Sequence, residues 1–210
     1  NKALAIWSPG GAALAEADLQ SWDATNFTLN WTANDATAYV IHFIAIGGAA
    51  TSAKVVNWQM ATTAPANKSV TGVGFKPDVV LHAHLGPGFT TAPPSGLAGA
   101  HFGLGVMDKN GGQWALDNES SNSAANNYPE TRGQQTNACI YGFDSGRMVQ
   151  KKASFVSMDP DGFTVNFTTA NTNASQVVSL ALKGVTAKAG SFLKSTAVAP
   201  ASQPVPGVGF

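Results

Sequence analysis

Two histidines separated by one residue are the first candidates for chemistry in this sequence. His82 and His84 flank Ala83 in an apolar stretch that reads as a strand, so both imidazoles project from one face. Three such pairs meeting on a trimer axis could bind a transition metal. Such a pair more commonly forms two polar positions on a half-exposed strand. We therefore expect no bound metal or other cofactor, with His82 and His84 as the candidates if one binds.

Two carboxylates in the segment Asp159-Pro160-Asp161-Gly162 suggest a second kind of cation site. Calcium prefers several oxygen ligands, and Asp159 with Asp161 supplies only part of such a set. Pro presets φ and Gly accepts a positive φ, so the same four residues are typical of a turn. We expect a turn.

A carbohydrate site on a β-sheet protein combines an exposed aromatic ring with amides and carboxylates. Trp114 lies near Asp117 and Asn118, and Tyr128 follows in a polar segment. Trp114, Asp117 and Tyr128 are therefore the candidate ligand-binding residues. However, Trp114 follows a hairpin turn on a predicted strand, where a tryptophan more often packs in the core.

Motifs of nucleophilic and nucleotide-dependent catalysis are absent. The sequence contains no Gly-x-Ser-x-Gly elbow, no Gly-x-x-x-x-Gly-Lys-Ser/Thr loop and no Gly-x-Gly-x-x-Gly that opens a helix. We expect a protein that is not an enzyme, with no catalytic residues.

Charge and cysteine content restrict the partners. The 210 residues include 12 Lys plus Arg and 12 Asp plus Glu, and charged residues make up only 11%. No basic surface is available for nucleic acid, and no apolar run is long enough for a membrane-inserted helix. Low charge favours dense packing between copies. The single cysteine, Cys139, lies in a predicted strand and is expected to be a buried small hydrophobe.

The elements that must position these residues are almost all strands. Phe27, Leu29 and Trp31 alternate with polar residues, as do Phe163, Val165 and Phe167. Further strands are predicted at Tyr39–Ile46, Val55–Met60, Asp78–Leu85, His101–Asp108, Gln113–Asp117, Asn137–Phe143, Lys152–Met158 and Val177–Leu182. Only residues 11–20 favour a helix. Residues 86–99 and 118–135 are expected to be the long loops. Short strands joined by turns predict antiparallel β-sandwich or jelly-roll-like domains.

The sequence repeats itself at a distance of about 135 residues. Phe27–Thr32 recurs as Phe163–Thr168 (163 − 27 = 136), and Val70–Phe75 recurs as Val205–Phe210 (205 − 70 = 135). Agreement at both ends of a long unit predicts tandem domains. Residues 1–48 would then be the C-terminal part of one unit and 49–184 a complete unit. Residues 185–210 would be a linker and the start of a third unit in a longer protein.

The aligned units share a pattern that resembles a module of tailed-bacteriophage virion and tail-associated proteins. The matching residues are Gly74-Phe75-Lys76-Pro77-Asp78, Trp114 with Asp117, Gly162-Phe163, and Ala181-Leu182-Lys183-Gly184. The resemblance covers roughly residues 70–184 and departs from the pattern at His82-Ala83-His84. It implies a β-sandwich in an oligomeric protein of the virion surface or tail, and it carries over no catalytic residue.

Composition, repeat and resemblance together predict a structural protein of a phage particle, such as a fibre, spike or capsid-decoration component. Its partners would be other virion proteins and copies of itself, located at the particle surface, with a host-surface glycan as a further partner. The alternative is a carbohydrate-binding, lectin-like β-sandwich module that recognises a host receptor.

Overall fold

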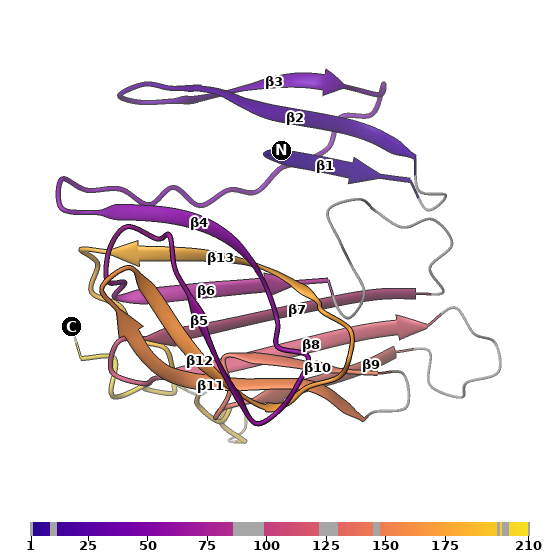
Figure 1. The fold of residues 1–210 in the computed structure, drawn as a ribbon. Coiled ribbons are helices and arrows are strands. Elements are labelled where there is room, and N and C mark those ends of the chain that lie inside the picture. The colour runs from indigo at the N-terminus through magenta and orange to yellow at the C-terminus, as the bar shows by residue number, and fades with distance from the viewer. Residues whose placement is uncertain are drawn as a thin grey trace. The chain divides into compact units, whose positions relative to one another are not determined.

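The computed structural model describes residues 2–8, 12–85, 99–121, 130–144, 148–196, 198 and 202–209. The described chain divides into two compact units. The N-terminal unit runs to Ile46, and the main unit runs from Gly47 onward. Every regular element described is a β-strand and every described pairing is antiparallel (Figure 1), which confirms the predicted all-β class.

The N-terminal unit contains a three-stranded sheet in the order β1-β2-β3. Its strands are β1 (Leu4–Trp7), β2 (Ala13–Trp22) and β3 (Phe27–Ala33). The helix predicted over residues 11–20 is therefore wrong, because β2 occupies this segment. Ala15 and Ala17 are buried at alternate positions and β2 pairs on both sides. This pairing outweighs the helix propensity of Ala, Leu and Glu.

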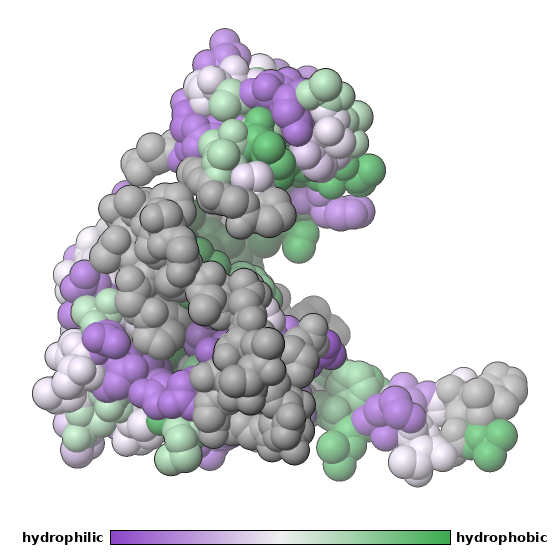
Figure 2. Space-filling view, turned by 90° about the vertical axis from the view of Figure 1, so that its right-hand side faces the viewer, coloured by the Kyte–Doolittle hydropathy of each residue, from purple (hydrophilic) through white to green (hydrophobic). Residues whose placement is uncertain are grey.

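The strand predicted at Tyr39–Ile46 is also wrong. The structure assigns no strand there, and Val40 and Ile44 are 82% and 89% exposed. A near-continuous apolar run forms a central strand only between two neighbouring strands. The described part of the N-terminal unit supplies no such neighbours. Figure 2 shows hydrophobic side chains reaching the surface of this unit among hydrophilic ones.

The main unit contains two antiparallel sheets. The first has the order β10-β11-β12-β5. Its strands are β5 (Ala66–Val70), β10 (Ile140–Phe143), β11 (Val149–Asp159) and β12 (Gly162–Thr169). The second has the order β4-β13-β6-β7-β8-β9. Its strands are β4 (Ser52–Gln59), β6 (Val79–His84), β7 (Gly99–Asp108), β8 (Gln113–Ser121), β9 (Glu130–Gln135) and β13 (Gln176–Lys183).

The two predicted long loops have different outcomes. The expected loop over residues 118–135 is wrong at both ends, because β8 continues to Ser121 and β9 begins at Glu130. These polar segments form strands because β9 is an edge strand, where polar side chains are tolerated. Of the other loop, residues 86–98 lie outside the described chain, and Gly99 already belongs to β7.

Both sheets contribute to one hydrophobic core. Phe163, Val165 and Phe167 of β12 are fully buried, as their alternation predicts. They share a cluster with Trp58 and Val80 of the six-stranded sheet. Two sheets around one core are compatible with the predicted β-sandwich.

Aspartate side chains form hydrogen bonds with backbone groups at the ends of the strands. Asp161 accepts hydrogen bonds from the backbone N–H groups of Gly72 (3.0 Å) and Gly74 (2.6 Å). Both glycines have a positive φ, of 83° and 84°, which favours glycine. Asp78 accepts a hydrogen bond from Gly184 N–H at 2.7 Å. These residues, far apart in the sequence, therefore meet in space and close the ends of the sheets.

The three-stranded sheet of the N-terminal unit has the same strand register as part of the main unit. In the hairpin β2–β3, Asp18 pairs with Asn30; in β11–β12, Ser154 pairs with Asn166. Both residues are displaced by the same amount (154 − 18 = 136; 166 − 30 = 136). The irregularities recur at this offset too, between Leu19/Ser21 and Phe155/Ser157, between Glu16/Ala17 and Lys152/Ala153, and between Ile6/Trp7 and Gly142/Phe143.

Candidate functional site

Three polar side chains come together on the inward face of the six-stranded sheet: His84 and Asp117, which are buried, and His101, which is partly buried. They come from the adjacent strands β6, β7 and β8. His84 pairs with Gly103 across β6 and β7, and Gly103 pairs with Asp117 across β7 and β8. A Cβ atom on Gly103 would overlap the imidazole ring of His84. The absence of a side chain at Gly103 therefore leaves the space that the His84 ring occupies.

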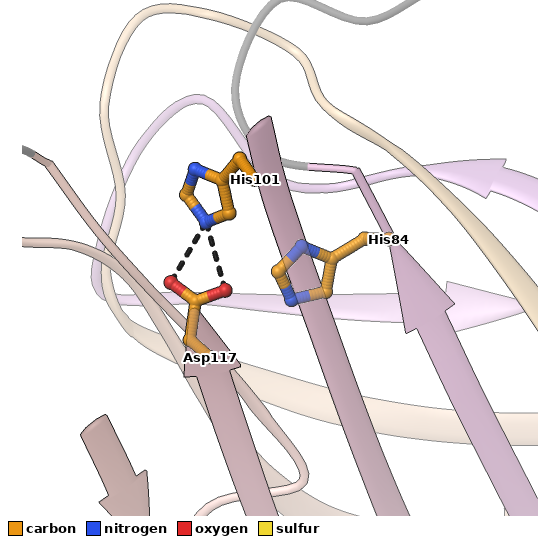
Figure 3. Close-up of side chains that lie close together, drawn as sticks. All are labelled: His84, His101 and Asp117. Carbon is orange, nitrogen blue, oxygen red and sulfur yellow. Dashed lines mark hydrogen bonds and ion pairs between the residues drawn. The ribbon is translucent and has the colours of Figure 1, made fainter. Parts of the chain in front are cut away.

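Hydrogen bonds hold this cluster in place and connect it to β10 of the opposite sheet. His101 Nε2 lies 2.8 and 2.7 Å from the two carboxylate oxygens of Asp117 (Figure 3). The backbone N–H of Phe143 donates to Asp117 Oδ2 at 3.0 Å, and His84 Nε2 lies 3.0 Å from the carbonyl oxygen of Tyr141. A carbonyl oxygen only accepts, so Nε2 carries the proton of neutral His84.

Burial decides the protonation state of His84. The desolvation of the imidazolium lowers the pKa of His84 to about 4, so the ring is neutral near pH 7. Its proton is on Nε2, and its Nδ1 lone pair has no hydrogen-bond partner among the described residues.

Glu119 adds a second unpartnered acceptor near the cluster. It pairs with His101 across β7 and β8. Burial raises the pKa of the Glu119 carboxyl group, while the charge of His101 acts in the opposite direction. Within the part of the chain that the structure describes, Glu119 Oε2 has no hydrogen-bond partner.

The side chains of the cluster can offer ligand atoms to a common point. One ring nitrogen of each histidine and one oxygen of Asp117 all lie within 4.8 Å of one another. The side chain of His101 is 9% exposed and that of Asp117 is 0% exposed. Two imidazoles and one carboxylate are ligands that suit transition metals.

The predicted pair of His82 and His84 lies on one face of β6, but both side chains are buried rather than half-exposed. His82 belongs to a different contact group. Trp58 Nε1 donates to Ser179 Oγ at 2.8 Å, and the same oxygen lies 2.8 Å from His82 Nδ1. His101 was not a candidate in the sequence, because only the register of β7 against β6 and β8 brings it to His84 and Asp117.

The three candidate carbohydrate-binding residues are not brought together. Trp114 is half-buried and packs with Val79 and Leu182. Trp114 lies on the outer face of β8 and Asp117 on the inward face, because residues three apart on a strand project from opposite faces. Tyr128 lies outside the described residues. The predicted core packing of Trp114 is thus partly met, on a secondary cluster.

The outer face of the six-stranded sheet carries a hydrophobic patch. We call it the outer apolar face, and its members are Val55, Leu81, Phe102, Leu104, Leu116 and Val178. Cross-strand pairs such as Leu104 with Leu116 place these side chains on one side. Residues 185–189 cover one end of the same face, where Ala189 is buried. Beside them lies a groove of about 420 Å³, lined by Trp114, Leu116, Phe192 and Leu193 among others.

The two aspartates of the β11–β12 turn have protein partners. Asp159 accepts hydrogen bonds from the hydroxyls of Ser157 and Thr164, both at 2.6 Å. The pKa of Asp161 is lowered by the N–H groups of Gly72 and Gly74. These contacts agree with the predicted turn.

No helix long and apolar enough to cross a membrane occurs in the described segments. A scan against protein-family models finds no match to this chain, and searches of the curated proteins and of the solved structures find no significant match.

Proposed function

We propose that this chain is a structural module of a bacteriophage virion, built from tandem β-sandwich units that act by assembly. The observation that carries the proposal is the recurrence of one pairing register, irregularities included, at a constant offset (166 − 30 = 136). Sheets of unrelated origin have no reason to share three irregularities.

The proposed mode of assembly is the association of copies of this chain through the outer apolar face. Exposed contiguous apolar patches mark interaction sites. The chain already uses one end of this face to bind its own residues 185–189. The formal net charge is zero, so copies do not repel each other at long range.

The resemblance to phage virion modules fits this role. Its matching residues Asp78 and Gly184 contact each other, and Gly162 begins β12. These positions close turns and strand ends rather than line a catalytic site. The lectin-like alternative has less support, because Trp114 and Asp117 lie on opposite faces of β8.

Analytical ultracentrifugation of the 210-residue chain tests the proposal. We expect an oligomer that the substitution Leu104→Lys dissociates, because a lysine would introduce a charge at the centre of the outer apolar face. Val156→Lys is the matched control: Val156 is 43% exposed on β11 of the other sheet, and Leu104 is 36% exposed. A monomeric wild-type chain, or equal effects of both variants, would refute assembly through this face.

Two further observations distinguish a virion structural protein from a lectin-like module. Detection of the protein in purified phage particles by mass spectrometry would support a virion role, and its absence from them would contradict it. Binding to a glycan array that Trp114→Ala abolishes without unfolding the chain would favour the lectin-like alternative.

A further inference from the structure

The cluster around His84 has more lone pairs than hydrogens to satisfy them. His84 donates through Nε2 to Tyr141, which leaves the Nδ1 lone pair free. Glu119 Oε2 is a second buried acceptor without a hydrogen-bond partner among the described residues. Asp117 adds two carboxylate oxygens with no access to solvent. Buried acceptors without donors are costly, and a cation satisfies several of them at once.

Contacts from both sheets support the side chains of this site. His84, His101 and Asp117 lie on three adjacent strands of one sheet. Tyr141 and Phe143 of β10 fix His84 and Asp117 from the opposite sheet. Such supporting contacts orient the ligands of metal centres. In Figure 3 the ring of His84 projects from β6 toward the pair formed by His101 and Asp117.

Small side-chain movements separate the observed distances from those of a tetrahedral centre. In such a centre with metal–ligand bonds of about 2.0–2.1 Å, two ligand atoms lie roughly 3.3 Å apart. His101 Nε2 and Asp117 Oδ2 are 2.7 Å apart, and all three ligand atoms lie within 4.8 Å of one another. A slight separation of His101 from Asp117 and an approach of the His84 ring would bring the three atoms to the required spacing.

We propose that His84, His101 and Asp117 bind one divalent transition-metal ion, with zinc the best match to two nitrogens and one oxygen in a tetrahedral site. Binding replaces the hydrogen bond between His101 and Asp117. His101 Nε2 must then be free of hydrogen, so neutral His101 carries its proton on Nδ1. These three protein ligands leave the fourth position of a tetrahedral site to a water molecule. The metal would be structural, because it joins three strands that β10 holds from the other side. This inference does not depend on the proposed assembly.

Cobalt(II) provides a direct probe, since it takes tetrahedral sites and gives visible d–d absorption there. The full chain is first dialysed against EDTA and then titrated with cobalt. We expect about one ion per chain and displacement by zinc. The variants His101→Gln and Asp117→Asn should each lose at least about tenfold in affinity, because mutation of even the outer-shell partners of metal ligands costs about 10–100-fold. His42→Gln, at an exposed histidine of the N-terminal unit, is the control and should bind as the wild type does.

Two measurements on the wild-type chain keep the test decisive if a variant fails to fold. At a zinc concentration about 100 times the dissociation constant, the melting temperature of the main unit should rise by roughly 5–10 °C. The chain has four histidines, and zinc should shift the imidazole ¹⁵N resonances of His84 and His101 but not those of His42. No cobalt spectrum, unshifted resonances of His84 and His101, or binding retained in the Asp117→Asn variant would overturn the proposal.

Discussion

Acid should destabilise the main unit through His82, whose ring is fully buried in the core. Desolvation, with a smaller contribution from the charge of His84, lowers the pKa of His82 to about 3. In the unfolded chain the pKa of a histidine is about 6.5. Between these values the unfolded chain binds a proton that the folded chain does not. The free energy of unfolding is therefore not reduced by His82 above about pH 6.5, and it falls as the pH decreases from there toward about 3.

The size of the stability loss follows from the difference between the pKa of histidine in the folded and in the unfolded chain. Each pH unit below about 6.5 costs about 1.4 kcal/mol per histidine that stays neutral in the fold. At about pH 5 this amounts to roughly 2 kcal/mol for His82 alone. His84, with a pKa of about 4, adds a similar loss. The wild-type chain should therefore lose about 4 kcal/mol between about pH 7.5 and about pH 5.

Urea unfolding followed by tryptophan fluorescence, in EDTA and at several pH values, measures this loss. In the His82→Asn variant the loss between the same two pH values should be smaller by about 2 kcal/mol, because one buried histidine is gone. The shorter amide can still bond to Ser179, which lies 2.8 Å from His82 Nδ1 in the wild type. His42→Asn should leave the wild-type pH dependence unchanged. An identical loss in the wild type and in His82→Asn would refute the reasoning.

Three further outcomes follow from the packing. Phe163→Ala should lower the free energy of unfolding by about 3–5 kcal/mol. Phe102→Ala should lower it far less, because Phe102 is half-exposed. Equal losses of the two variants in urea unfolding would contradict the assignment of Phe163 to the core. Gly103→Ala should cost about 1–3 kcal/mol, because the new Cβ atom would overlap the His84 ring, and a variant as stable as the wild type would argue against that ring position. Cys139 should resist a thiol reagent until the chain unfolds, because burial raises the pKa of its thiol to about 12; rapid labelling of the native chain would contradict its burial.

Local patterns in the sequence are sufficient for much of the main unit. Alternation identifies the buried side of β12 correctly, because Phe163, Val165 and Phe167 face a core on one side only. Turn residues identify the β11–β12 connection for a similar reason, since Asp159 accepts hydrogen bonds from Ser157 and Thr164, which flank the turn. Such signals depend mainly on neighbours along the chain.

The features that sequence reasoning missed depend on neighbours in space. Ala15 and Ala17 belong to a segment with helix-forming composition, and only pairing with β1 and β3 makes it a strand. The segment from Tyr39 to Ile46 has the composition of a central strand without the adjacent strands that such a strand needs. No spacing rule connects His101 with His84 in the sequence, because the register of two strands brings them together.

The constant offset between the two hairpins has a genetic consequence. Gln20 and Val156 occupy the same position in their ladders, each skipped where the register shifts. A crossover that joined Gln20 directly to Ser157 would remove one whole period of the sequence (156 − 20 = 136) and create a hybrid hairpin. In that hybrid Asp18 would face Asn166, the same ladder position that Ser154 holds now. If the chain is built from the proposed tandem units, unequal recombination would lengthen or shorten its gene while each product keeps its hairpins in phase.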